Sequence, residues 1–353
     1  MAVLTLNAGS SSLKFAVFEG ERAVLRGAFE AITEAPKAKA EADGEKLDPP
    51  VVEGTGHEAV LPALFAWVEQ HLGGTRLAAV GHRIVHGGER TGAALVDDAL
   101  LAELEALVPL APLHQPHNIA AIRAAQRAEP GLPQVACFDT AFHRTLPPVA
   151  RQLALPERLG LRRYGFHGLS YEWIAGRLPP HLAAGRTVVA HLGSGASLCA
   201  LLHGKSVETT MSTTPLDGLV MGTRCGSLDP GVVLHLVRTL GTDAAEHLLY
   251  QQSGLLGVSG VSADMRDLHG TGPAVELFAY RAAMDVAWMA TAMGGMDGLV
   301  FTGGIGEHDA AVRQAICARL GWLGVGEEGQ VDVRVIPTDE EAVIARQSLA
   351  LAG

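Results

Sequence analysis

The sequence is short of cysteine and of long apolar runs, and each shortage excludes a class of protein. Its four cysteines lie far apart, without the spacing of a metal site or of a disulfide framework, so we interpret them as reduced core thiols. No stretch approaches the roughly 18 apolar residues that a membrane span requires, and the opening MAVLTLN lacks the basic start of a signal peptide. We therefore expect a cytoplasmic protein without a membrane partner.

Positive charge is also scarce. The chain has 27 Lys and Arg residues against 38 Asp and Glu, a net charge of −11 at pH 7, so its charge does not attract nucleic acid or an anionic membrane. A site for an anionic substrate must then be a local cationic pocket. The 353 residues, 48% of them hydrophobic, suit two domains of roughly 150 residues, each with a buried core.

A strand–turn–strand pattern at the start of the chain recurs about half a chain later. Residues 3–20 read VLTLNAGSSSLKFAVFEG and residues 188–205 read VVAHLGSGASLCALLHGK, and the two align without a gap. This similarity predicts two domains built on one plan. Coincidence is the alternative, because strand–turn–strand patterns are common.

Helical and strand patterns alternate between and after these segments. Apolar spacing predicts helices at residues 59–72, 99–107, 117–128, 230–240, 243–251, 274–293 and 340–350. Short apolar runs predict strands at residues 80–85, 135–138, 299–302 and 331–336. The alternation favours mixed α/β domains with a cleft between them. Residues 35–56 are rich in Lys, Glu, Asp and Pro, and we expect a solvated excursion there.

Three glycine- and serine-rich turns follow apolar strands, at residues 7–12 (NAGSSS), 191–195 (HLGSG) and 303–306 (GGIG). Glycine lets backbone N–H groups approach a phosphate closely, so the three turns together suggest a phosphate cradle. None matches the P-loop pattern or the dinucleotide fingerprint. Ordinary tight turns remain the alternative.

Arginine and histidine lie among glycines in residues 81–88 (GHRIVHGG), 164–168 (YGFHG) and 221–226 (MGTRCG). An arginine flanked by glycines can reach a carboxylate or phosphate with both arms of its guanidinium, and a histidine on an apolar wall can donate to a developing oxyanion. Most of the 15 histidines could equally be surface or core residues. A zinc site is a further, less favoured interpretation, because no cysteine or carboxylate lies at ligand spacing with its candidate histidines. Those candidates are His82, His86, His114 and His117.

Ten blocks of sequence, in order along nearly the whole chain, resemble those of the acetate kinase family. They are LNAGSSSLKF, GHRIVHGGE, APLHQPHN, FDTAFH, YGFHGLSY, HLGSGAS, TTPLDGLVMGTRCGSLDP, SGLLGVSGVSADMRDL, FTGGIGE and VIPTDEEAVIAR. The resemblance implies an α/β fold of two duplicated actin-like, ribonuclease H-like domains, each a mixed sheet with flanking helices, around a central cleft. Residues 1–142 with the C-terminal helix 340–353 would form the first domain, and residues 143–339 the second.

The resemblance also implies the reaction. It is the reversible, in-line transfer of the γ-phosphate of ATP to acetate, giving ADP and acetyl phosphate, with Mg²⁺ or Mn²⁺. It further implies a homodimer through the second domain, with residues 283–295 as a candidate surface. The net negative charge leads us to expect no nucleic-acid partner. A kinase for propionate or butyrate is one alternative. A non-enzymatic actin-like nucleotide-binding protein is another, although it need not keep Arg83, His167 and Arg224 together.

The family's functional residues can be placed on this chain one by one. The catalytic residues would be Asp139, His167 and Arg224, although Asp139 could equally cap a turn at a strand end. The residues that would bind the acid are Arg83, Val85, Leu113, His114, Phe166 and Pro215. The residues that would line the nucleotide site are Lys14, His191, Leu192, Gly193, Ser194, Gly195, Asp264, Met265, Arg266, Gly304, Ile305, Gly306, Glu307 and His308. The metal would be held by Asn7 and Glu340.

The chain departs from the family pattern at a few of these blocks. Ser194 and His308 each stand where asparagine is usual, and Ser227 stands where aspartate is usual. Leu169 and Tyr171 replace threonine and histidine shortly after His167, and the segment between residues 307 and 335 is short. These differences leave the nucleotide preference open.

Overall fold

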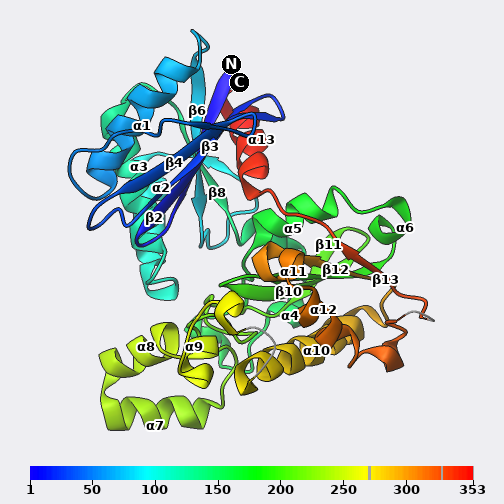
Figure 1. Cartoon of the computed structure of the whole chain (residues 1–353). Helices are drawn as coiled ribbons and strands as arrows, with labels where there is room; N and C mark the ends of the chain where they lie inside the picture. The colour runs from blue at the N-terminus through cyan, green and yellow to red at the C-terminus, as the bar shows by residue number, and fades with distance from the viewer. Residues whose placement is uncertain (269–271, 327–328, 353) are drawn as a thin grey trace. The chain divides into compact units, whose positions relative to one another are not determined.

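The computed structural model describes residues 1–268, 272–326 and 329–352. Contacts divide the chain into two compact units, Met1–Phe142 with Asp339–Gly353, and His143–Thr338. The strands of the described residues form two sheets, one in each unit, flanked by helices (Figure 1). Across the same ranges, no helix is long and apolar enough to cross a membrane.

The sheet of the first unit combines an antiparallel meander with parallel strands. Its order is β5-β4-β3-β2-β1-β6-β8-β7, in which β1, β6 and β8 run parallel. The bounds are β1 Ala2–Ala8, β2 Ser12–Glu19, β3 Arg22–Glu30, β4 Lys37–Ala42, β5 Glu45–Leu47, β6 Leu77–Ile84, β7 Ala94–Leu95 and β8 Gln134–Phe138. Strands β1 and β8 are buried along almost their whole length because helices cover both faces of the sheet, which explains their continuous apolar runs.

Helices from distant parts of the chain cover the two faces (Figure 1). On one face α1 (His57–His71) and α3 (Gln115–Ala128) pack over residues such as Leu4 and Phe15. On the other face α13 (Glu340–Ala352) packs against β1, β6 and β8. A Cβ at Gly81 would lie only 2.3 Å from Ser348 Oγ, so glycine in β6 allows α13 to approach closely. The first unit also contains helix α2 (Asp98–Ala106), which has nine residues.

The expected solvated excursion at residues 35–56 is only partly correct, because β4 and β5 extend the sheet there. In β4 alanine alternates with Lys and Glu, so the inward face carries only small side chains and the outward face is charged. Alanine and lysine are poor strand formers. Pairing with β3, a contact that local composition does not reveal, therefore determines this structure.

The second unit repeats the same succession of strands. Its order is β11-β10-β9-β12-β13, with β9, β12 and β13 parallel, as β3-β2-β1-β6-β8 are ordered in the first unit. The bounds are β9 Arg186–Leu192, β10 Ala196–Leu202, β11 Lys205–Thr209, β12 Gly298–Thr302 and β13 Asp332–Val335. The predicted mixed α/β fold is confirmed. The gapless alignment is inexact in its register, because Ala8 pairs with Leu13 whereas Leu192 pairs with Ala196, across a turn one residue shorter.

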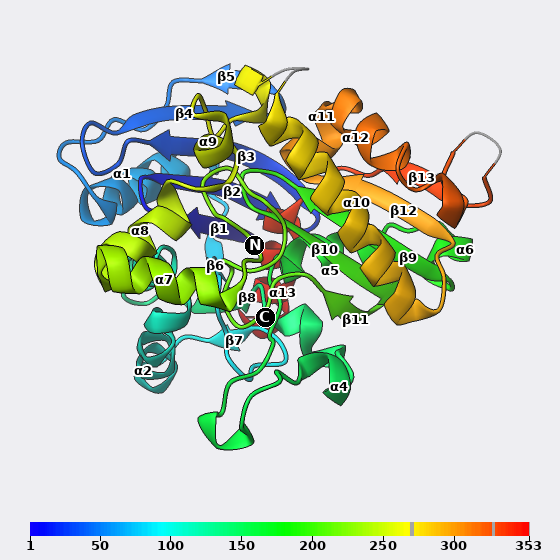
Figure 2. The same cartoon turned by 90° about the horizontal axis from the view of Figure 1, so that it is seen from below.

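Helices of the second unit lie largely where apolar spacing predicts them. The long helix α10 packs along β9, β10 and β11 (Figure 2). The bounds are α4 Pro148–Arg151, α5 Gly168–Ala175, α6 Pro180–Ala183, α7 Pro230–Leu240, α8 Thr242–Gln251, α9 Gly254–Ser259, α10 Pro273–Met293, α11 Gly303–His308 and α12 Ala310–Cys317. The predicted turn at residues 303–306 is instead the first turn of α11. None of the four cysteines, all of them among the described residues, is in a disulfide, but only Cys137 and Cys199 are fully buried, so the core assignment is correct for two of them.

Candidate functional site

The predicted site residues fall into two sets, one in each unit. In the first unit, strands β6 and β8 end side by side, and Asp139 directly follows β8, where its backbone N–H donates to Ile84 O at 2.9 Å. Arg83 Nε donates to Asp139 Oδ1 at 3.1 Å and Nη2 donates to Oδ2 at 2.7 Å. This two-point ion pair fixes the plane of the guanidinium. Asp139 is only 1% exposed, so it is a buried counter-ion and not merely a turn cap.

Two further predicted residues meet the remaining arm of Arg83. Its Nη1 lies 3.4 Å from Asn7 Oδ1, at the end of β1, and 3.5 Å from Glu340 Oε2, at the start of α13. Burial alone would lower the pKa of the Arg83 guanidinium, but the charges of Asp139 and Glu340 raise that pKa well above its usual value. Residues 7, 83, 139 and 340 therefore form one cluster, here called the Arg83 cluster, in which the cation stays charged.

The donor set of this cluster fits a hard divalent cation. Asn7 and Glu340 present an amide oxygen and a carboxylate to the same Nη1, and oxygen donors are what Mg²⁺ prefers, with water and phosphate completing its shell. Zinc fits less well. Among the described residues no group of three His, Cys, Asp or Glu could hold a metal ion. The four histidines of the zinc alternative therefore do not form such a group, and His82 Nε2 instead lies 2.6 Å from Gln134 Oε1, while His86 Nδ1 accepts from Gly88 N at 3.1 Å.

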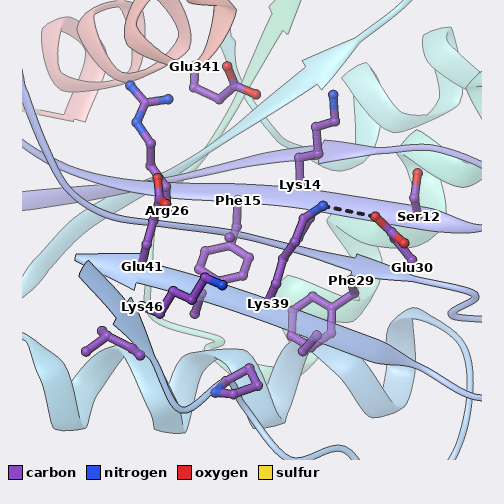
Figure 3. A pocket seen from close by; sticks show the side chains of 16 residues that line it. Ser12, Lys14, Phe15, Arg26, Phe29, Glu30, Lys39, Glu41, Lys46 and Glu341 are labelled. Carbon is purple, nitrogen blue, oxygen red and sulfur yellow. Dashed lines mark hydrogen bonds and ion pairs between the residues drawn. The ribbon is translucent and has the colours of Figure 1, made fainter. Parts of the chain in front are cut away.

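Lys14 lies opposite Asn7 in the β1–β2 hairpin and is exposed. It lines a pocket of about 840 Å³ in the first unit, together with Ser12, Arg26 and Glu341 (Figure 3). Figure 3 shows Lys14 pointing to the same side of the sheet as Glu341 of α13. Burial and the neighbouring Glu340 raise the pKa of the Glu341 carboxyl. The ammonium group of Lys14, on its flexible side chain, therefore lies near Asn7, one of the two candidate metal ligands of the Arg83 cluster.

Besides Arg83, the predicted acid-binding residues of this unit are Val85, Leu113 and His114. Val85 is buried, and its backbone N–H donates to Asn118 Oδ1 at 3.0 Å. The other amide atom of Asn118 donates to Ala8 O at 2.9 Å, so this α3 residue joins the ends of β1 and β6. Leu113 and His114 are half-buried just before α3 begins. The sequence prediction missed Asn118, although it lies in the APLHQPHN block.

The second set is centred on His167, the residue before α5. Its φ is +57°, a left-handed conformation that non-glycine residues rarely adopt and that costs about 1–3 kcal/mol. Its Nδ1 lies 2.9 Å from Ser197 Oγ, and its ring stacks on that of His191 with centroids 4.3 Å apart. His191 Nδ1 in turn lies 2.8 Å from Ser170 Oγ. His167 is thus held by contacts on several sides, a pattern typical of functional residues.

Arg224 and the turn at residues 193–195 converge on the same place. Arg224 Nη1 donates to the backbone oxygen of Pro215 at 2.6 Å, which connects two predicted site residues. A Cβ at Gly195 would lie 2.5 Å from Arg224 Nη2 and 3.3 Å from His167 Nε2. A side chain at residue 195 would therefore displace the guanidinium of Arg224, and the structure brings His167 and Arg224 to one side of this turn. Phe166, directly before His167, is buried.

The glycine-rich segments after β9 and β12 pack against each other. Gly303 has a φ of +76°, and a Cβ there would lie 2.8 Å from Leu192 O. A Cβ at Gly193 would be 3.9 Å from the backbone N of Gly304. Glu307 accepts from the backbone N–H of Gly303 at 2.9 Å and of Thr338 at 3.1 Å, so its carboxylate caps its own helix.

The other predicted nucleotide residues are more peripheral. Arg266 forms an ion pair with Asp264 at 2.6 Å and is 85% exposed, and His308 is 82% exposed. Met265, which lies between Asp264 and Arg266 in the sequence, is buried and lines a cavity of about 550 Å³ with residues of α10 and α12. Ile305 and Gly306 lie in α11, and Ser194 accepts at its backbone oxygen from Gly222 N at 2.9 Å. The second unit thus carries both glycine-rich segments and a cavity lined mainly by apolar residues.

Comparisons with known proteins match the whole chain. A family model described as the acetokinase family matches residues 2–346. A curated acetate kinase from Rhodopseudomonas palustris is 47% identical over 390 aligned residues, covering 99% of this chain and 98% of that protein. Among solved structures, a propionate kinase from Francisella tularensis has a TM-score of 0.90 at 36% identity, covering 99% of each chain. An acetate kinase from Porphyromonas gingivalis has a TM-score of 0.86 at 34% identity, covering 100% of each chain.

Proposed function

Because the chain belongs to the acetokinase family, we propose that it catalyses the ATP-dependent phosphorylation of acetate, giving acetyl phosphate and ADP in a reversible reaction. The observation that carries the proposal is the full-length similarity to curated acetate kinases. In addition, Arg83, His167 and Arg224 are each held in place by neighbouring residues of the structure. A non-enzymatic nucleotide-binding protein would have no reason to keep all three.

The relatives do not favour a longer acid. Relatives at 41–47% identity carry the name acetate kinase, whereas the propionate kinase is 36% identical. The test is hydroxamate formation from ATP with acetate, propionate and butyrate in parallel. We expect the highest kcat/KM with acetate, and a preference for propionate or butyrate would contradict the proposal.

The chemistry requires positioning and charge neutralisation. A carboxylate is already a nucleophile at pH 7, so no general base is needed. The difficulty is to bring two anions together and to stabilise charge on the transferring phosphoryl oxygens. We assign Arg83 to the carboxylate, because Asp139 orients its guanidinium. We assign Arg224 and His167 to the phosphoryl group, because the two meet at the glycine turn beside residue 195.

Asn7 and Glu340 are the residues that would hold Mg²⁺, or Mn²⁺, because their oxygens flank Arg83 Nη1. When bound, the cation would neutralise phosphate charge. The backbone groups of residues 193–195 and 303–304 would face the phosphates, and the cavity at Met265 would take the apolar face of the base. ATP and ADP are the nucleotides that this assignment implies.

Assembly as a homodimer is part of the proposal, through the second unit. The predicted surface at residues 283–295 needs revision, because much of that segment packs inside its own unit and exposes chiefly Met284 and Trp288. Helix α7 buries none of its residues and leaves Leu234 and Leu240 about half exposed, at 53% and 49%. An apolar helix face of this kind is typical of an interface. A cytoplasmic location agrees with this function.

A further inference from the structure

We propose that Tyr171 and Ser197 are positioning residues for His167. Through one chain of hydrogen bonds they keep the neutral imidazole in the tautomer whose proton is on Nε2, so that His167 donates to the transferred phosphoryl group as an uncharged donor. This inference rests on the proposed function, since the acceptor is the phosphoryl group.

The chain of hydrogen bonds is short and buried. Ser197 Oγ lies 2.9 Å from His167 Nδ1 and 2.5 Å from Tyr171 Oη. Tyr171 and Ser197 have no exposed surface, and His167 is 8% exposed. Bulk water therefore does not compete with these hydrogen bonds in the folded protein. Tyr171 comes from α5 and Ser197 from β10, so two regular elements support the contact.

The register of the sheet explains why these side chains meet. Ser197 pairs directly with His191 across β9 and β10, so both side chains point to the face that α5 covers. On that face Tyr171 bonds Ser197, while Ser170, its neighbour in α5, bonds His191 at 2.8 Å. One helix thus orients both the ring of His167 and the ring stacked on it.

The direction of the hydrogen bonds follows from acidity. A serine hydroxyl has one proton to donate, so Ser197 can donate to His167 or to Tyr171, but not to both. A phenol, with a pKa near 10, is a much stronger acid and better donor than an aliphatic alcohol. We infer that Tyr171 donates to Ser197, which leaves the one proton of Ser197 for the bond to Nδ1. A neutral imidazole that accepts at Nδ1 carries its proton on Nε2.

The opposite nitrogen points to where the reaction is proposed. His167 Nε2 would lie 3.3 Å from a Cβ at Gly195, and Arg224 Nη2 would lie 2.5 Å from the same position. The stacked His191 ring, inclined by only 22°, opposes rotation of the imidazole. The backbone of His167 is left-handed and therefore strained, and these contacts hold it in that conformation.

Tyr171 is also a departure of this chain, since histidine is the residue that family resemblance leads us to expect there. The histidine of the family pattern can therefore serve as a conservative replacement for Tyr171. Tyr171→Phe removes only the hydroxyl, whereas Tyr171→His restores a ring N–H that can donate toward Ser197. A merely structural role for Tyr171 would not depend on this difference.

The first experiment is NMR of the full chain with ¹⁵N-labelled histidine at pH 8, where the ring ¹⁵N shifts distinguish the two tautomers. The His167 signals are assigned by their loss in His167→Gln. We expect a protonated Nε2 and a bare Nδ1 in the wild type, and a mixture of tautomers in Tyr171→Phe. A wild-type His167 with its proton on Nδ1 would overturn the proposal, even if Tyr171→Phe does not fold.

The second experiment is kinetic. We expect Tyr171→Phe to lower kcat about tenfold, the effect of about one hydrogen bond, with little change in the acetate KM, and Tyr171→His to recover most of it. Thr187→Val is the matched control, because it removes a buried hydroxyl at the other end of β9, where Thr187 Oγ1 donates to Leu182 O. It should leave kcat and tautomer unchanged.

An unchanged kcat and tautomer in Tyr171→Phe would contradict the assignment of Tyr171. The two proposals fail in different ways. A wild type that forms no acyl phosphate from acetate would overturn the proposed function, whereas the ring ¹⁵N shifts would still decide whether Ser197 and Tyr171 set the tautomer.

Discussion

The guanidinium of Arg83 and the carboxylate of Asp139 face each other edge to edge, with Nη2 and Oδ2 2.7 Å apart and with Asp139 almost completely buried. The two residues lie 56 positions apart and meet only because β6 and β8 are parallel neighbours. The pair orients one arm of Arg83 toward Asn7 and Glu340. The ends of three strands and of one helix thus determine where this cation can act.

Asp139→Asn should weaken acid binding, because it keeps the shape of the side chain but removes the charge that orients Arg83. We expect the acetate KM to rise about tenfold, for a loss of roughly 1.5 kcal/mol from a charge-assisted bond. The matched control is Asp297→Asn, which breaks a similar two-point pair with Arg186 at the surface of the second unit. Steady-state kinetics with equal KM values in both variants would argue against the role of Asp139.

Arg83→Ala and Arg224→Ala should affect different constants. Loss of Arg83 removes ground-state binding of the carboxylate, so we expect mainly a higher acetate KM. Loss of Arg224 removes contact with charge that develops during transfer, so we expect a lower kcat, by about two orders of magnitude. The measurement is initial rates over a range of acetate concentrations. Unchanged kinetics in both variants would refute the site assignment.

His167→Ala should lower kcat by roughly two to three orders of magnitude with little change in melting temperature, if His167 donates to the phosphoryl group. His167→Gln should recover part of this activity, because an amide N–H replaces an uncharged donor. Rates and thermal unfolding are measured on the same preparations. A lower melting temperature with intact turnover would show that His167 only fills space.

Stability should fall in mild acid because buried histidines resist protonation. Burial lowers the pKa of His82, and likewise that of His143, to about 4. Between pH 6.5 and 4 the unfolded chain binds protons that the folded chain does not, so stability is greatest above pH 6.5 and declines as the pH falls toward 4. Each histidine can contribute up to about 3 kcal/mol of this loss.

His82→Gln tests this dependence. We expect its melting temperature to fall less steeply between pH 7 and pH 5 than that of the wild type, because one proton fewer is taken up on unfolding. His247→Gln, at an exposed position of α8, is the control and should follow the wild type. Parallel curves for wild type and His82→Gln would contradict the prediction.

Leu234→Glu should dissociate the proposed dimer, because it places a charge on the exposed apolar face of α7. Light scattering after gel filtration would then give a monomer mass. Val51→Glu, at an 86% exposed apolar residue of the first unit, is the control. A monomer mass for the wild type at micromolar concentration would remove the dimer from the proposal.

Local patterns predicted those elements that bury one continuous face. Helix α7 begins and ends where apolar spacing places it, at residues 230 and 240, and β12 differs by one residue. Strand β4 was missed because its stability comes from pairing with β3 and not from its alanines. The start of α11 was taken for a turn because three glycines in four residues conceal a helix that Glu307 caps from within.

The residues of the candidate site were likewise predicted only in part from the sequence. Motif resemblance supplied Arg83, Asp139 and His167, but no spacing reveals that Ser197 bonds a histidine 30 positions earlier. Asn118 and Ser170 were missed for the same reason, since each bonds a residue on another element. Such partners depend on sheet register and helix placement, which single-sequence patterns do not determine.

The first unit is built from both ends of the chain, with the second unit inserted between them. During translation, residues 143–338 leave the ribosome before α13 does. The face of β1 and β2 that α13 covers, including Val3, Ala16 and Phe18, therefore stays bare until synthesis has passed residue 339. The second unit, continuous in sequence, can fold first, although it is encoded later. A nascent chain thus completes its N-terminal unit last, and its exposed apolar strands are a natural binding site for chaperones in the meantime.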